Sequence, residues 1–300
     1  MKQIRLVADV GGTNSRIGLA GNGVLIAATV RSYRNDDHAD FFSVADAFLS
    51  ETGPLTIDEI AVAVAGPVSE GTARLTNRDW RFDETALSSR LKADRVCLLN
   101  DLNALGYATP FLDPGRLDTV FMTDAPHRAS GQALIVGIGT GFNVSPVVNT
   151  AGQVRCLNAE LGHAPLPSDI AEILTDQFGA AAADFRTVEE VFSGRGYAAL
   201  SGLHGDTSVA GNTTDKGFQS FYTKLLGTLA RSLMLTFLPS SGIFFAGGVA
   251  RSLLDTPARD RFVDVYSLPF DLNNLQPAPV FLIRDDAAAL LGCAKYPMGS

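Results

Sequence analysis

The sequence DVGGTNSR, residues 9–16, places a carboxylate two positions before a pair of glycines, a threonine and an asparagine. Glycine lets a ligand approach the backbone closely, and the backbone N–H groups of such a turn form a concavity of anion size. Asp9 would repel an anion unless a divalent metal ion lay between the two. A phosphate group with magnesium would therefore satisfy the whole stretch, and a tight hairpin turn would explain its glycines equally well.

Two further glycine turns follow apolar segments, at residues 137–141 and 246–248. The chain has neither the G-x-x-x-x-G-K-[ST] motif of P-loop proteins nor a G-x-G-x-x-G that opens a helix after a strand. Three separated glycine turns at the ends of apolar segments indicate a nucleotide held between two halves of the chain. Close packing of a helix on a strand also favours glycine, and this is the alternative explanation for Gly247 and Gly248.

Asn100 and Asp101 end the apolar stretch RVCLL and precede a segment with helical character. A single carboxylate at such a point can accept a proton from a hydroxyl group that attacks a phosphate. From the spacing alone, capping of the following helix explains Asp101 at least as well.

Glu160 and His163 are spaced as Glu-x-x-His, and Glu189 and Glu190 form an acidic pair. A carboxylate and an imidazole can together bind the hydroxyl groups of a sugar. Glu-x-x-His also occurs in metal sites, but these need further ligands and no cysteine cluster follows here. An exposed acidic pair at a helix start is also favoured by the helix dipole alone.

The apolar pattern alternates between strands and helices, which is typical of an α/β protein with a mixed sheet. Residues 4–10, 59–66 and 95–100 are expected to be strands, residues 23–33 a further strand, and residues 41–52 and 83–93 helices. Residues 132–148 repeat the layout of residues 4–20, with an apolar run, a glycine turn and a second apolar run. This repetition predicts a duplicated architecture.

The chain has 300 residues, of which 46% are hydrophobic and 19% charged, enough for about two domains with real cores. Its net charge of −8 and the lack of a basic run interleaved with aromatic residues argue against nucleic acid as a partner. Three widely spaced cysteines predict a reducing, cytoplasmic location. The longest apolar zone, 233–250, contains Pro239 and two serines, so no membrane partner is expected.

Seven motifs occur along the chain in the order in which bacterial glucokinases of the proteobacterial type carry them: DVGGTNSR, LTNRDW, LLNDLNALGYA, GIGTGFN, ELGH, EEVFSG and FFAGGVARSLL. The chain therefore resembles this family of the hexokinase–actin-like ATPase superfamily over nearly its full length. The resemblance implies two α/β domains, each a ribonuclease H-like unit, with ATP and sugar in the cleft between them. It also implies a small domain, 1–108 completed by the C-terminal helix 285–300, and a large domain, 109–284.

The same resemblance implies phosphorylation of D-glucose by ATP at the C6 hydroxyl, with Asp101 as the catalytic base. Magnesium would be held by Asp9, through water. The residues implied for the sugar are Asn77, Asn100, Asp101, Glu160, His163 and Glu189. Those implied for the nucleotide and its phosphates are Asp9, Gly11, Gly12, Thr13, Asn14, Gly139, Thr140, Gly141, Gly247 and Gly248.

Several points stay open at this level. Asn143 stands where many members of the family have a glycine, and its side chain could narrow the second phosphate turn. The segment 203–217 is short for the family, and either Glu189 or Glu190 could contact the sugar. Another hexose or an amino sugar is the alternative substrate, and a sugar-binding regulator without turnover is the alternative function. A homodimer is compatible with the sequence, which does not fix the oligomeric state.

Overall fold

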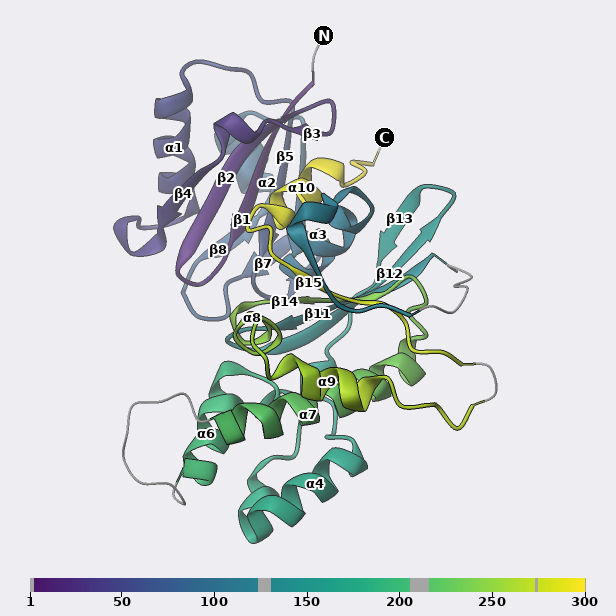
Figure 1. Ribbon diagram of the computed structural model, residues 1–300. Coiled ribbons are helices and arrows are strands. Elements are labelled where there is room, and N and C mark those ends of the chain that lie inside the picture. Colours follow the sequence, from purple (N-terminus) through teal and green to yellow (C-terminus); the bar gives the residue numbers. More distant parts are fainter. Residues whose placement is uncertain (1–2, 124–130, 206–215, 273–274, 300) are drawn as a thin grey trace. The chain divides into compact units, whose positions relative to one another are not determined.

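The computed structural model in Figure 1 describes residues 3–123, 131–205, 216–272 and 275–299. Strands and helices alternate in a mixed α/β fold with several sheets, as the sequence predicts. Two compact units form, residues 1–112 with 285–300, and residues 113–284. The domains expected from the sequence differ from these units in the assignment of residues 109–112. Within the described ranges, no helix combines the length and apolar character that a membrane span requires.

The first unit is built around β1 (Ile4–Val10), which pairs antiparallel with β2 (Asn14–Gly21). On its other side β1 pairs in parallel with β5 (Glu59–Val64), and β5 with β9 (Arg95–Asn100). The carboxyl ends of these three parallel strands therefore lie at one edge of the sheet. The other strands of the unit are β3 (Val24–Leu25) and β4 (Arg31–Arg34), which pair with β2, and a small separate sheet of β6 (Val68–Ser69), β7 (Thr72–Arg74) and β8 (Arg81–Asp83).

Residues 23–33 were expected to form one strand, and this is wrong. A 3-10 turn, Ala27–Thr29, separates β3 from β4. The Thr29 hydroxyl accepts a hydrogen bond from the backbone N–H of Leu19 on β2 at 2.9 Å and donates to the carbonyl of Ile26 at 2.7 Å. A side chain thus takes the place of the backbone partner that a continuous strand would supply.

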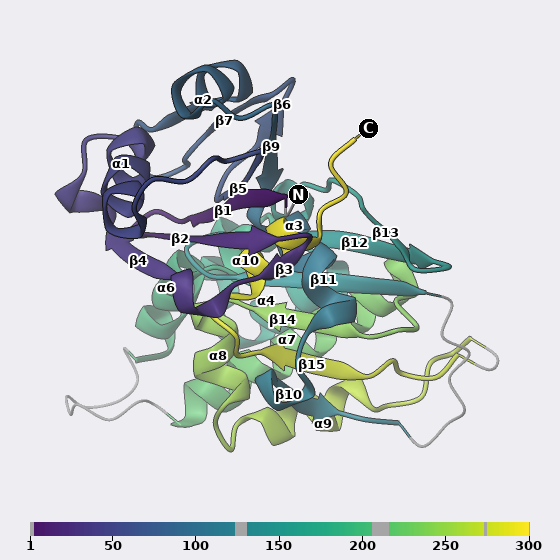
Figure 2. The same ribbon diagram turned by 90° about the horizontal axis from the view of Figure 1, so that it is seen from above.

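Alternate residues of β1 pack against different helices, because side chains of a strand point to opposite faces in turn. Leu6, Ala8 and Val10 share a core with α1 (Phe41–Thr52) and α2 (Glu84–Leu91). Val7 belongs to a second core with α3 (Asp101–Ala108) and α10 (Ala288–Lys295), so the sheet lies between two helical layers (Figure 2). Asp9 follows Val7 by two positions and therefore lies on the α3 and α10 face.

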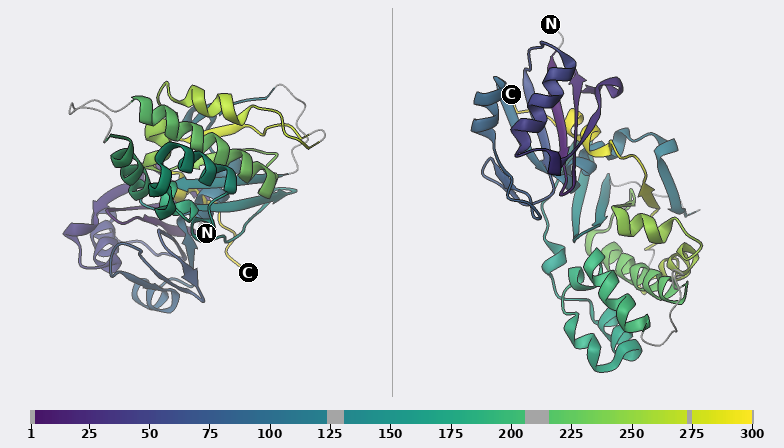
Figure 3. Two further views of the ribbon diagram at one scale, coloured as in Figure 1. Left: turned by 90° about the horizontal axis from the view of Figure 1, so that it is seen from below. Right: turned by 90° about the vertical axis from the view of Figure 1, so that its left-hand side faces the viewer.

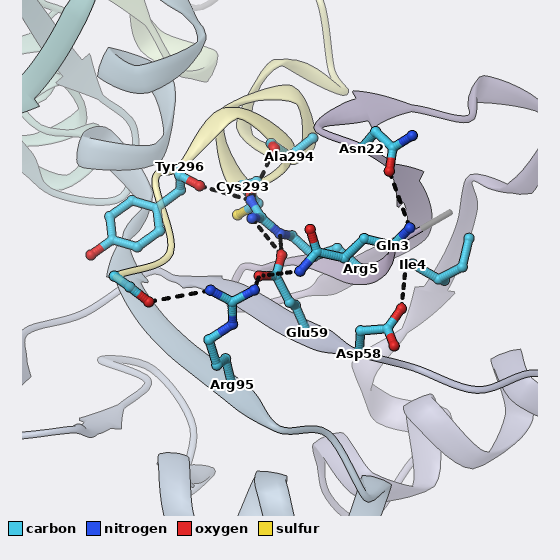
Figure 4. Close-up of polar contacts among 11 residues, drawn as sticks. Gln3, Ile4, Arg5, Asn22, Asp58, Glu59, Arg95, Cys293, Ala294 and Tyr296 are labelled. Atoms are coloured by element: carbon cyan, nitrogen blue, oxygen red, sulfur yellow. Dashed lines mark hydrogen bonds and ion pairs between the residues drawn. The ribbon is translucent and has the colours of Figure 1, made fainter. Parts of the chain in front are cut away.

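Buried charges tie the last residues of the chain to this sheet (Figure 4). The Arg5 guanidinium pairs with the Glu59 carboxylate at 2.6 Å, and both side chains are at most 10% exposed. Arg5 also donates to the carbonyls of Cys293, Ala294 and Tyr296 at 2.8 to 2.9 Å. Every donor of this buried arginine that faces the C-terminal segment has an acceptor, so α10 is fixed to β1 although 288 positions separate Arg5 from Cys293.

The second unit contains one sheet in the order β10-β15-β14-β11-β12-β13. Its strands are β10 (Leu117–Phe121), β11 (Gln132–Ile138), β12 (Phe142–Thr150), β13 (Gln153–Cys156), β14 (Ile243–Ala246) and β15 (Val280–Ile283). Its helices are α4 (Ser168–Phe178), α5 (Val188–Val191), α6 (Gly194–Gly205), α7 (Lys216–Phe237), α8 (Gly248–Leu254) and α9 (Arg259–Tyr266). Leu134, Val136 and Ile138 share a core with α7, against which α9 packs (Figure 3).

The two units repeat one strand order. In the first unit the path is β3-β2-β1-β5-β9, and in the second β13-β12-β11-β14-β15. In both, the central strand pairs antiparallel with the strand that follows it and in parallel with a later one. The duplication expected from the two glycine hairpins is therefore present in the topology, and each hairpin connects the same two strands of its unit.

Candidate active site

The carboxyl edge of the first sheet brings two carboxylates into electrostatic contact. Asp9 lies beside Ala63 of β5, Ala63 lies beside Leu99 of β9, and Asp101 follows two residues later as the first residue of α3. Burial, together with the negative charge of Asp9, raises the pKa of Asp101 to about 7. A carboxylate with such a pKa exchanges its proton near neutral pH.

The pKa of Asp9 is also raised above its ordinary value. Burial raises the pKa of Asp9 to about 6, the positive charge of Arg16 opposes this shift, and Asp286 adds to it. The Arg16 guanidinium lies 3.7 Å from the Asp9 carboxylate, and 18% of the Asp9 side chain is exposed. The positive charge of Arg16 therefore balances the negative charge of Asp9 only in part. Such a carboxylate is suited to bind a cation.

Asn100, rather than Asp101, is the N-cap of α3. Its side-chain oxygen accepts from the backbone N–H of Leu102 at 3.0 Å, and its amide donates to the carbonyl of Gly66 at 3.1 Å. Asp101 Oδ1 also accepts from Leu102 at 3.0 Å, but Asn100 holds the capping position. Capping alone therefore does not account for the aspartate.

The first glycine turn is held from behind by a residue that the sequence analysis missed. Asn35 is fully buried, and its amide donates to the carbonyl of Gly11 at 2.7 Å while its oxygen accepts from the Ser15 hydroxyl at 2.7 Å. Its backbone N–H donates to the carbonyl of Thr13 at 2.9 Å. The polar stretch around residue 35 has no pattern that would single out this asparagine.

Asn77 lies beside the same turn. A Cβ added to Gly12 would be 3.5 Å from its side-chain nitrogen. The neighbouring Arg78 donates to the carbonyls of Gly12 and Asn35, each at 3.4 Å, and pairs with Asp36. Asn77 is exposed, and Trp80 three residues later is buried.

In the second unit, the other glycine turn lies against Glu189. The Gly139 N–H donates to the Gly141 carbonyl at 3.0 Å, and the Gly139 carbonyl accepts from Gly194 at 2.7 Å. A Cβ on Gly141 would be 2.7 Å from the Glu189 carboxylate, so a side chain at this position would displace that carboxylate. Thr140 at the tip is exposed.

The structure separates the two candidates of the acidic pair. Glu189 Oε2 accepts from the backbone N–H of Phe142 at 3.0 Å, and Oε1 accepts from Arg195 at 3.0 Å. Glu190 instead accepts from the backbone N–H groups of Arg186 and Thr187 at 2.7 and 2.8 Å, as part of the capping box of α5. These bonds, that from Thr187 foremost, hold the pKa of Glu190 below its usual range.

The segment of Glu160 and His163 meets the start of β12. A Cβ on Gly162 would lie 2.3 Å from the carbonyl of Phe142 and 3.4 Å from Cβ of Glu189, so only glycine allows this approach. Glu160 and His163 are exposed on either side of it. Glu189 and Gly162, which lies between Glu160 and His163 in the sequence, thus meet at Phe142 after the glycine turn.

Asn143 faces that segment. Whether its side chain narrows the glycine turn is open from the sequence, and the structure shows its amide hydrogen-bonded to residues 159–161. Residues 206–215 of the short segment 203–217 lie outside the described part of the chain.

Gly247 packs on the end of β11. Its φ is +98°, and a Cβ there would lie 2.3 Å from the carbonyl of Ile138 and 3.2 Å from the N–H nitrogen of Gly139. Close packing therefore explains this glycine, and the same contact puts it next to the second glycine turn. Around Gly248 a Cβ would meet nothing within 4 Å, so packing does not require the second glycine.

No group of three or more histidine, cysteine or acidic side chains in the described ranges is placed to hold a metal ion by itself. The three cysteines, Cys97, Cys156 and Cys293, are free. A metal ion at Asp9 would therefore need ligands from a bound substrate or from water.

Solved sugar kinases share this fold. A glucokinase from an Antarctic psychrotroph superposes with a TM-score of 0.78 at 25% identity, over 98% of both chains. A glucokinase of the ROK family from Streptomyces griseus, solved with glucose and AMPPNP, superposes with a TM-score of 0.59 at 16% identity, over 98% of both. The duplicated fold is thus the fold of solved sugar kinases.

The sequence narrows the class to one family. The model of the glucokinase family matches residues 6–299. The glucokinase of Nitrobacter hamburgensis is 31% identical, over 99% of this chain and 98% of its own. The chain belongs to the glucokinase family. It is an enzyme whose family phosphorylates glucose with ATP.

Proposed function

We propose that the chain transfers the γ-phosphoryl group of ATP to the C6 hydroxyl of D-glucose, with Asp101 as the catalytic base. The observation that carries this proposal is the half-buried Asp101 carboxylate, whose pKa is about 7 beside Asp9. The sugar oxygen forms a bond to the γ-phosphorus, the bond from that phosphorus to the bridging oxygen of ADP breaks, and Asp101 takes the hydroxyl proton. Glucose 6-phosphate and ADP are the products.

The sugar would be bound by Asn77, Asn100, Asp101, Glu160, His163 and Glu189. Exposure of Glu160 and His163 supports this assignment, since both side chains are available to a ligand. A carboxylate accepts hydrogen bonds from two hydroxyl groups, and an imidazole can donate one bond and accept another. Glu189 is preferred to Glu190, because the carboxylate of Glu190 is used within its own helix start.

The phosphates would lie along the two glycine turns. Thr13, Asn14 and Thr140 are exposed at the turn tips, where their polar groups can meet an anion. The nucleotide assignment comprises Gly11, Gly12, Thr13, Asn14, Gly139, Thr140, Gly141, Gly247 and Gly248, with Asp9 nearby.

The residues present fit magnesium. Mg²⁺ in phosphoryl-transfer enzymes is usually held by one or two carboxylates together with substrate phosphates and water. Asp9, only partly compensated by Arg16, is the residue that would hold it, through water. Bound there, the ion would neutralise charge on the phosphates during transfer.

The proposal also covers the type of domain, the location in the cell and the oligomeric state. We assign each unit to a ribonuclease H-like domain of the actin-like ATPase type, and the shared strand order supports this. We place the enzyme in the cytoplasm, in keeping with three free cysteines. A homodimer stays a prediction that light scattering on the purified protein would test.

The test is a coupled assay of ADP release with glucose, mannose, fructose, glucosamine and N-acetylglucosamine at saturating magnesium-ATP. Glucose should give the highest kcat/KM. A higher value for another sugar would replace glucose as the substrate, and ADP release that Asp101→Asn leaves unchanged would overturn the assignment of the base.

A further inference from the structure

We propose that Asn143 is a positioning residue that holds Glu160 in the conformation that binds the sugar, and so sets the affinity for glucose. This inference rests on the proposed function of Glu160. It starts from the side chain of Asn143, the second residue of β12, which carries one acceptor and two donor N–H groups.

All of these groups are directed to one short segment or to the adjacent backbone. Asn143 Nδ2 donates to the Ala159 carbonyl at 2.6 Å and to Glu160 Oε2 at 3.2 Å. Its oxygen accepts from the backbone N–H of Leu161 at 3.0 Å and from that of Val144 at 2.9 Å. The amide therefore binds the backbone on both sides of Glu160 as well as its carboxylate.

The contacts to Ala159 and Leu161 are those that a neighbouring peptide group would make in a sheet, a carbonyl accepting and an N–H donating on either side of one residue. Residues 157–160 belong to no strand in the structure. Asn143 thus replaces a missing strand partner, and the backbone conformation of Glu160 depends on it.

The bond to Oε2 acts on the carboxylate itself. Glu160 is exposed, and a free glutamate side chain would occupy several rotamers that a ligand has to reduce to one. A donor fixed on a strand selects one orientation in advance and leaves Oε1 for the sugar hydroxyls. Preorganisation of this kind raises affinity without a new contact to the ligand.

The same hydrogen bonds predict whether loss of the Asn143 amide changes the KM for glucose or the KM for ATP. The side chain of Asn143 makes no polar contact to the residues assigned to the phosphates, since its hydrogen bonds go to residues 144 and 159–161. Loss of its amide should weaken binding of the sugar and leave binding of ATP nearly as it is.

The experiment compares Asn143→Ala with the wild type and with Asn149→Ala, a matched control from the same strand. For Asn143→Ala we expect the KM for glucose to rise about tenfold, the scale of a lost hydrogen bond to a charged group. The KM for ATP should change by less than about twofold, and Asn149→Ala should change neither. An unchanged KM for glucose, or equal increases in both KM values, would overturn the inference.

Coupling to Glu160 is tested by a double-mutant cycle with Glu160→Gln. If Asn143 acts through the carboxylate, the increase in KM caused by Asn143→Ala should be smaller in the Glu160→Gln background than in the wild type. Equal increases in both backgrounds would show that Asn143 acts elsewhere and would contradict the proposal.

A second variant covers the case in which Asn143→Ala does not fold. Asn143→Asp keeps the shape and the acceptor for Leu161 but removes both donors and places a negative charge beside Glu160. Its KM for glucose should exceed that of the wild type by more than about tenfold, and a wild-type value would overturn the inference. Failure of the wild type to phosphorylate glucose would instead refute the proposed function, so the two failures are distinguishable.

Discussion

The carboxylate of Glu189 accepts a hydrogen bond of 3.0 Å from the backbone N–H of Phe142, the residue that follows the second glycine turn. Glu190, the next residue, directs its carboxylate to the N–H groups of Arg186 and Thr187. Two adjacent glutamates of one helix start therefore have different tasks, one at the candidate site and one in the cap of α5.

This difference predicts that the same Glu→Gln change affects sugar binding at position 189 and stability at position 190. Glu189→Gln should raise the KM for glucose by about tenfold or more, since it removes the charge that would bind sugar hydroxyls. Glu190→Gln should lower the melting temperature, because it weakens the capping box, and should leave the KM for glucose unchanged. Steady-state kinetics and thermal unfolding of both variants decide the matter, and a sugar defect confined to Glu190→Gln would reverse the assignment.

Asp101→Asn should keep the fold and much of the sugar affinity but lower kcat by at least ~10²-fold, the usual contribution of a general base. Asparagine can still accept the hydrogen bond from Leu102, yet it cannot take the hydroxyl proton. Coupled assays give kcat, and calorimetric titration gives glucose affinity. Near-normal turnover would show that another group accepts the proton.

The pH dependence of stability follows from the raised pKa of Asp101. Its ordinary value is 3.8 and its value in the folded protein is about 7. Between these values the folded state binds more protons than the unfolded state, so this group makes the free energy of unfolding fall as pH rises through the window. Asp101→Asn should therefore raise the melting temperature of the ligand-free protein at pH 8, and the difference should vanish near pH 4.

Activity should rise with pH as Asp101 loses its proton, whereas the free energy of unfolding falls. The base must be deprotonated, so kcat/KM for glucose should fall as pH drops below about 7, the value to which burial raises the pKa of Asp101. Asp9 and Asp101 interact, and the apparent value belongs to the pair. A pH–rate profile that stays flat from pH 8 to pH 5.5 would contradict the assignment.

Asn35→Ala should raise the KM for ATP more than the KM for glucose. The change removes the bonds to Gly11 and Ser15 and leaves buried polar groups unpaired, at a cost of ~1–3 kcal/mol. The first glycine turn then loses its fixed shape. Tyr33→Phe is the matched control, because its hydroxyl bonds to Glu51 and not to the turn. Equal effects of both variants on the KM for ATP would remove Asn35 from the nucleotide site.

Glu59→Ala should lower the free energy of unfolding by about 3–5 kcal/mol, since it leaves the buried Arg5 without its counter-charge. Arg95→Ala should cost much less, because the Arg95 side chain is 42% exposed. Urea unfolding of the two variants measures both values. Similar small losses would mean that the C-terminal segment is held by apolar packing alone.

The sequence by itself located most of the strands and helices and pointed to the residues proposed to carry the chemistry. Continuous apolar runs located β1, β5 and β9, because a strand buried on both faces is apolar at nearly every position. The glycine turns mark hairpins, and the repeat of residues 4–20 in 132–148 shows in the strand order of both units. These properties depend on near neighbours in the chain, so they can be read without the fold.

Only the tertiary structure decided which polar groups meet. Asn35, Asn143 and the choice between Glu189 and Glu190 depend on contacts between segments that lie up to 47 residues apart. Arg5 and Cys293 are brought together across 288 positions. A local pattern reports whether a position is buried but not which distant group approaches it. The hydrogen bonds that hold the candidate site are therefore fixed by the packing of the sheets, which no short stretch of the sequence contains.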